Sequence, residues 1–138
     1  ELNDLLHSCD IISLHLPSLP ETRGMMGKEQ FEIIKPGAYI VNCARGDIID
    51  EAALYNALIQ GKVTGAALDV MTQEPFDLKN PLVSLPNVVL TPHVAAVTKE
   101  AANLTYKQVV TSTLTILDGG MVENVANPEA FDHPRWKR

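Results

Sequence analysis

Short apolar runs alternate with helical patterns along these 138 residues, and this alternation constrains the fold more than any other feature. Each run is rich in Val, Ile, Leu and Ala and ends at a turn signal or a polar residue, as buried strands do. The expected strands cover residues 10–16, 38–44, 65–70 and 88–90. Strands that alternate with helices are typical of a parallel sheet covered by helices on both faces. The sequence therefore predicts an α/β fold.

Helix signals fill the gaps between the expected strands. The chain opens on a helical pattern, and residues 28–34 form a second one that stops before Pro36. Asp50 is the expected N-cap of a third helix, which Gly61 ends. Thr98 is the expected cap of a longer helix that runs to about residue 117. Its expected inner positions are Ala102, Tyr106, Val110, Leu114 and Leu117.

Composition excludes several classes of partner. The net charge of −6 argues against binding to nucleic acid or to an anionic membrane surface. The basic residues near the C-terminus, Arg135, Lys137 and Arg138, are expected to form a solvated tail. Cys9 and Cys43 lie in apolar runs, so we expect reduced, buried thiols in a cytoplasmic protein; a catalytic thiol at Cys43 is the alternative.

Three polar residues follow the expected strands. Arg45 follows residues 38–44, Glu74 comes a few residues after 65–70, and His93 follows 88–90. Ligands of parallel α/β sheets bind at the carboxyl ends of the strands, so we expect the three side chains to converge. A guanidinium, a carboxylate and an imidazole together suit an anionic 2-oxo acid whose carbonyl oxygen must be protonated.

Each of these residues also has a plainer interpretation. Arg45 could form a surface ion pair with Asp47 or Asp50. His93 could be a core histidine bonded to a backbone carbonyl, and Glu74 could be an exposed loop residue. The sequence by itself leaves these alternatives open.

Asp69 stands inside an apolar run, where an unpaired carboxylate is costly. It could accept hydrogen bonds from a ligand amide or from donors of the protein itself, and the pattern favours neither. The other histidines are weaker candidates. They are His7 in the opening helix, His15 at the end of a strand and His133 in the tail.

Four segments resemble the D-isomer-specific 2-hydroxyacid dehydrogenase family and together span nearly all of residues 1–128. They are residues 9–17 with Glu21-Thr22, residues 35–46 with Asp50-Glu51 and Ala53-Leu54, residues 65–70 with Glu74-Pro75, and residues 87–96 with Thr98. The resemblance implies an NAD(P)-binding Rossmann domain with a partial parallel sheet. It also implies an oxidoreductase that reversibly reduces a 2-oxo acid to a D-2-hydroxy acid.

The resemblance also implies a role for each candidate residue. Arg45 would bind the substrate carboxylate, His93 would donate the proton, and Glu74 would hydrogen-bond His93. The cofactor, NAD with NADP left open, would contact residues at the strand ends. These are Leu16, Cys43, Ala44, Arg45, Asp69, His93, Ala95 and Ala96.

The sequence departs from the family in lacking a G-x-G-x-x-G turn. We therefore expect a fragment that is inactive alone. Residues 1–118 would be the second half of the cofactor domain, without its first βαβ unit, and residues 119–138 a return segment or tail. An unpaired strand edge at residues 10–16 predicts a homodimer. An NAD(H)-sensing binding module of a transcriptional co-regulator is the alternative function.

Overall fold

The computed structural model describes residues 1–134 of the chain. The chain divides into two compact units, Glu1–Ala96 and Val97–Arg138. The helix starting after Thr98, which the sequence analysis placed with residues 1–118, thus belongs to the second unit. None of the helices in residues 1–134 is long and apolar enough to cross a lipid bilayer.

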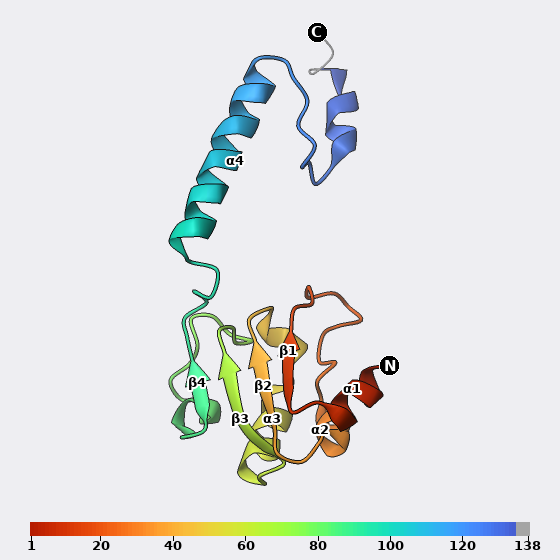
Figure 1. The fold of residues 1–138 in the computed structure, drawn as a ribbon, viewed down its shortest axis with the longest axis vertical. Helices are drawn as coiled ribbons and strands as arrows, with labels where there is room; N and C mark the ends of the chain where they lie inside the picture. Colours follow the sequence, from red (N-terminus) through yellow and green to blue (C-terminus); the bar gives the residue numbers. More distant parts are fainter. Residues whose placement is uncertain (135–138) are drawn as a thin grey trace. The chain divides into compact units, whose positions relative to one another are not determined.

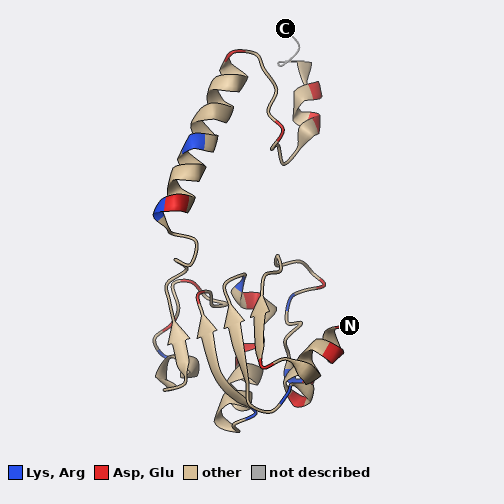
Figure 2. Ribbon diagram, in the orientation of Figure 1, with Lys and Arg blue, Asp and Glu red and all other residues tan. Residues whose placement is uncertain are grey.

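A four-stranded parallel sheet forms the centre of the first unit (Figure 1). Its strands are β1 (Ile11–Leu14), β2 (Ala38–Asn42), β3 (Val63–Leu68) and β4 (Val88–Leu90), in sequential order. None of them carries a charged residue, as Figure 2 shows. All four carboxyl ends lie at one edge of the sheet (Figure 1). The α/β class and the parallel sheet are therefore confirmed.

The helices of the first unit begin and end close to the expected positions. They are α1 (Leu2–Ser8), α2 (Lys28–Ile33) and α3 (Glu51–Ile59), with short 3₁₀ turns η1 (Gly46–Ile48) and η2 (Pro81–Ser84). The Asp50 side chain accepts hydrogen bonds from the backbone N–H groups of the first turn of α3, as a good N-cap does. Gly61 follows α3 with φ of +71°, a conformation that favours glycine.

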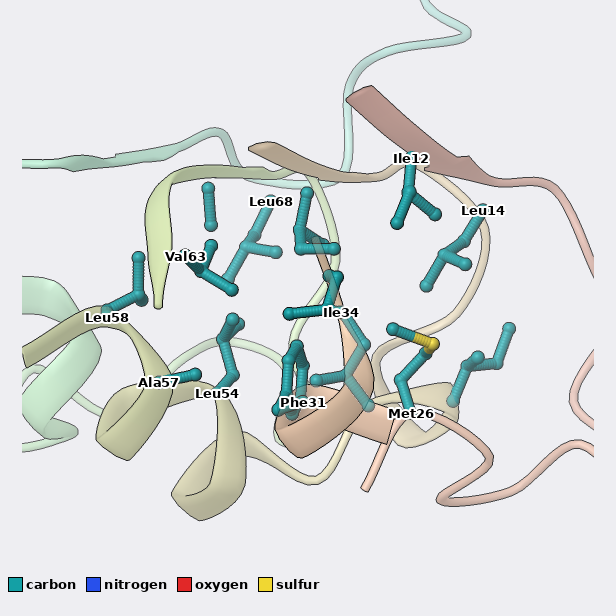
Figure 3. Packing of buried hydrophobic residues seen from close by; sticks show 14 of the residues in the cluster. Ile12, Leu14, Met26, Phe31, Ile34, Leu54, Ala57, Leu58, Val63 and Leu68 are labelled. Atoms are coloured by element: carbon teal, nitrogen blue, oxygen red, sulfur yellow. The ribbon is translucent and has the colours of Figure 1, made fainter. Parts of the chain in front are cut away.

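The core lies between one face of the sheet and the helices (Figure 3). Ile12, Ile40 and Ala66 are in register across β1, β2 and β3, and all are buried. Phe31 of α2 and Leu54 of α3 pack against this layer. In β1 and β2, therefore, alternate residues are buried, whereas β3 also buries Gly65 beside Ala66 and β4 buries no residue.

The helices of the first unit cover this one face, whereas the sequence predicted helices on both. Sequential strand order with crossovers of one hand places every connection on the same side of the sheet. On the opposite face Ile11, Tyr39 and Val89 are 65%, 48% and 64% exposed. The predicted α/β fold class is right, and within the first unit the helices cover one face of the sheet.

The second unit contains α4 (Lys99–Leu117) and the 3₁₀ turn η3 (Pro128–Asp132). The Thr98 side chain accepts a hydrogen bond from the Ala101 N–H, so the predicted cap is confirmed. α4 buries no residue, and the predicted inner positions Tyr106, Val110 and Leu114 are more than half exposed. The turn η3 forms within residues 119–138, which the sequence predicts to be a return segment or tail. The basic cluster of this tail lies outside the described residues.

Both cysteines are free, but the prediction that both are buried is wrong. Cys9 is half-buried and Cys43 is exposed. Cys43 comes directly after β2, and its side chain is exposed between the buried residues Asn42 and Ala44. The apolar run 38–44 therefore extends past the strand that it predicted.

Candidate active site

The turn after β2 is held by the buried side chain of Asn42, which is 1% exposed. Its Oδ1 accepts a hydrogen bond from the Ala44 N–H at 3.0 Å, and its Nδ2 donates to the Arg45 carbonyl at 2.9 Å. A buried amide with both ends paired fixes the turn that carries Arg45. The sequence analysis gave Asn42 no role, although an amide at the end of an apolar strand was a usable signal.

Gly46 brings this turn into contact with the loop after β3. A Cβ atom at this position would overlap the backbone of Met71 and Thr72. Only glycine allows two main chains to approach so closely. The turn that carries Arg45 and the loop that carries Glu74 are thus packed directly on each other.

Asp69 holds the turn that carries His93. Its Oδ1 accepts hydrogen bonds from the Thr91 hydroxyl and the Val94 N–H, and its Oδ2 accepts from the Ala95 N–H at 2.9 Å. Burial by itself would raise the pKa of Asp69, but these hydrogen bonds outweigh burial and the pKa lies below its ordinary value. The His93 N–H donates to the Asp69 carbonyl at 2.8 Å, and His93 has φ of +55°.

This arrangement answers the question that the sequence left open about Asp69, because its own chain pairs the carboxylate. The sequence predicted no role for Thr91, although it lies in the segment 87–96 that carries the family resemblance. It was detectable only as a hydroxyl one residue past the end of a strand. Asp69 and Thr91 therefore fix the backbone from which the His93 side chain extends.

Glu74 and His93 form a hydrogen-bonded pair, with His93 Nδ1 and Glu74 Oε2 2.8 Å apart. The hydrogen bond to His93 lowers the pKa of Glu74 below its ordinary value against the effect of burial. The Met71 N–H, which donates to Glu74 Oε1, and the charges of His93 and Arg45 lower it further. The side chains of His93 and Glu74 are 49% and 41% exposed. His93 is therefore not a core histidine. Glu74 is an exposed loop residue, as its plainer interpretation has it, but its carboxylate is paired with the His93 ring.

Arg45 is exposed beside this pair. Its Nη1 donates to the Ala44 carbonyl at 2.6 Å, and within residues 1–134 its guanidinium has no ion-pair partner. Asp47 pairs with Arg23 instead, and Asp50 caps α3. The surface ion pair offered as the plainer interpretation does not form.

The remaining predicted cofactor residues also lie at the carboxyl edge. Leu16 follows β1 and is 38% exposed, and Cys43, Ala95 and Ala96 are exposed. Ala44 is buried. A carboxylate offers about four acceptor positions, so Asp69 with three donors keeps one for a ligand amide. These residues fit the uncharged amide end of a dinucleotide.

A parallel sheet with its polar residues at the carboxyl edge defines the class of α/β proteins that bind ligands at that edge. Within this class the sequence matches one family. Residues 1–95 match the model of the D-isomer specific 2-hydroxyacid dehydrogenase, NAD binding domain. The chain therefore belongs to the NAD-binding domain family of the D-isomer-specific 2-hydroxyacid dehydrogenases.

Similar proteins agree with this assignment. The D-3-phosphoglycerate dehydrogenase of Methanocaldococcus jannaschii is 46% identical over 127 residues, which cover 92% of this chain and 24% of that protein. The glyoxylate/hydroxypyruvate reductase B of Pectobacterium carotovorum is 38% identical, with 95% of this chain and 41% of that protein covered.

A solved structure agrees as well. The NAD-complexed D-isomer specific 2-hydroxyacid dehydrogenase of Lactobacillus delbrueckii ssp. bulgaricus superimposes with a TM-score of 0.83 at 35% identity. The match covers 91% of this chain and 42% of that one. The chain thus spans between a quarter and two fifths of the length of these proteins.

Proposed function

We propose that the protein containing this chain reversibly reduces a 2-oxo acid to a D-2-hydroxy acid with NAD or NADP, and that this chain supplies the groups that move the proton. The observation that carries the proposal is the Glu74–His93 pair, 2.8 Å from Oε2 to Nδ1, beside the guanidinium of Arg45, which has no ion-pair partner within residues 1–134. Family membership supports it, and so do the names of the relatives.

Arg45 binds the substrate in this proposal. A guanidinium presents N–H groups in a planar fork that matches a carboxylate with two parallel hydrogen bonds. Asn42 holds the backbone of Arg45 in one conformation, and Gly46 sets its distance from the loop of Glu74. The guanidinium also polarises the substrate carbonyl, so negative charge that develops on its oxygen is stabilised.

His93 supplies the proton. Glu74 occupies the Nδ1 side of the ring, so Nε2 is the nitrogen that faces the substrate and gives its proton to the carbonyl oxygen. The Glu74 carboxylate orients the ring and stabilises the imidazolium before transfer. In the oxidative direction neutral His93 takes the proton back.

The cofactor contacts are proposed to come from Leu16, Cys43, Ala44, Asp69, Ala95 and Ala96. A bound nicotinamide would supply the hydride that reaches the carbonyl carbon. Residues 1–138 contain no glycine-rich turn for the pyrophosphate. We therefore expect weak NADH binding and negligible turnover from this chain alone.

NADH oxidation with glyoxylate, hydroxypyruvate and pyruvate tests the proposal in a protein of the relatives' length that contains residues 1–138. Arg45→Ala should raise KM and lower kcat, because the guanidinium both binds the carboxylate and polarises the carbonyl, and His93→Ala should lower kcat by about 10²–10⁴-fold. His7→Ala is the matched control, because His7 is exposed on α1, and it should leave activity unchanged. Tight NADH binding without turnover of any 2-oxo acid would overturn the proposal and favour the NAD(H)-sensing alternative.

A further inference from the structure

Glu51 connects helix α3 to the loop that carries Glu74. It is the first residue of α3 and is half-buried. Its Oε1 accepts a hydrogen bond from the Thr72 N–H at 2.7 Å, and its Oε2 accepts from Asn80 Nδ2 at 2.6 Å. One carboxylate therefore holds the loop near its beginning and near its end, and bonds to an ionised acceptor are the stronger kind.

The connection reaches Glu74 through a short turn. Thr72 lies two residues before Glu74, and Glu74 Oε1 accepts from the Met71 N–H at 3.3 Å. The other oxygen of Glu74 contacts His93. A shift of the backbone at Thr72 would therefore change the point from which Glu74 reaches the imidazole.

The middle of this loop has few other restraints in the described chain, although Met71 before it is buried and Phe76 after it packs against the core. Residues 72–75 are all exposed, so burial contributes little to holding them. Gly46 packs against the loop at Met71 and Thr72 but offers no side chain to bond it. Apart from the Glu74–His93 pair itself, the two hydrogen bonds of Glu51 are the long-range side-chain bonds that hold this loop within the described chain.

We propose that Glu51 is a positioning residue, which holds Thr72 and Asn80 so that Glu74 meets His93 Nδ1. Its catalytic consequence rests on the proposed function, whereas its effect on the Glu74–His93 pair is a property of this chain alone. In this proposal Glu51 only accepts hydrogen bonds from Thr72 and Asn80, and it does not contact the substrate.

The position of the proton on the His93 ring is the primary measurement, made by ¹⁵N NMR on the 138-residue chain without cofactor. In the wild-type chain the neutral ring should carry its proton on Nδ1, because Glu74 accepts it there. Glu51→Ala should make the Nε2–H form, which a histidine side chain free in water prefers, the major one. The carboxyl titration of Glu74 should move back up towards its ordinary value.

Three further variants separate positioning from general destabilisation. Glu51→Gln should be intermediate, because its amide oxygen still accepts from Thr72 while its NH₂ faces the NH₂ of Asn80. Asn80→Ser keeps a cap for the Leu82 N–H but no longer reaches Glu51, and should shift the tautomer in the same direction. Glu29→Ala is the control, because Glu29 occupies the first turn of α2 and is exposed.

The outcomes are distinct. If folded Glu51→Ala and Asn80→Ser chains both keep the Nδ1–H form, the inference is wrong; if Glu51→Ala does not fold, Asn80→Ser alone decides. A wild-type ring with its proton on Nε2 would overturn it as well. In the longer enzyme Glu51→Ala should lower kcat by about 10- to 100-fold with little change in KM. Absence of turnover in the wild-type enzyme would reject the proposed function while leaving the NMR result standing.

Discussion

At the residue scale, buried polar side chains at the ends of β2 and β3 build the active-site turns in the same way. Asn42 folds the chain back towards Arg45, and Asp69 folds it back around His93. Both are hydrogen-bonded within the chain, and among residues 1–134 no buried side-chain nitrogen or oxygen lacks a hydrogen-bond partner. The reactive side chains are exposed, whereas the groups that place them are buried.

Asp69→Asn should destabilise the chain at neutral pH. The substitution replaces an oxygen with an NH₂ group that faces donors, so at least one partly buried hydrogen bond loses its acceptor. We expect a loss of about 2–3 kcal/mol in the free energy of unfolding, measured by urea denaturation at pH 7. Thr91→Val removes one donor only and should cost about 1 kcal/mol.

The same variant predicts a pH dependence. The native pKa of Asp69 lies below its ordinary value of 3.8, so its stabilising contribution is complete above that value and is lost as the pH falls through the native pKa. The stability difference between wild type and Asp69→Asn should shrink as the pH is lowered below about 4. A difference that stays constant down to pH 2 would contradict the assignment.

At the element scale, the contact between the turn after β2 and the loop after β3 decides whether Arg45 and Glu74 share one site. Gly46→Ala should separate them, because the new methyl overlaps the backbone of Met71 and Thr72. Overpacking of this kind costs about 1–3 kcal/mol in stability, measured by urea denaturation. The tautomer of His93 should change as well.

Gly61→Ala is the comparison for this prediction. Gly61 has φ of +71° and open space around its Cβ position, so alanine there meets backbone strain without a clash. It should cost about 1 kcal/mol and leave His93 unchanged. Equal effects of the two variants on His93 would show that the site does not depend on the close approach of Gly46.

At the scale of the whole molecule, the first unit presents an unpaired strand edge and an uncovered face of the sheet. Among the described strands β1 pairs only with β2, and Ile11 of β1 is 65% exposed. Unpaired strand edges of this kind tend to pair with strands of another chain.

We expect a dimer or larger species in sedimentation velocity, and we expect Ile11→Lys to favour the monomer. Ile59→Lys, at a 54% exposed position of α3, is the control. A wild-type monomer at every concentration would contradict this.

The sequence predicted the strands and helices because their signals are local. Apolar runs marked the strands, and Asp50, Gly61 and Thr98 marked the ends of helices. These signals placed each element within a few residues. It also placed Arg45, Glu74 and His93 at one edge, since carboxyl ends of parallel strands converge. The boundaries of β2 and β3 were less accurate, because apolar residues continue past the last ladder hydrogen bond.

By itself, therefore, the sequence determined the class of fold, the order of its elements and the residues that meet at the carboxyl edge. Only the tertiary structure decided which polar groups pair there. It joined Glu74 to His93, gave Asp69 to Thr91 and the turn after it, and tied Glu51 to the loop of Glu74. Hydrogen bonds depend on distance and direction between residues far apart in the chain, and these are set by packing rather than by local pattern.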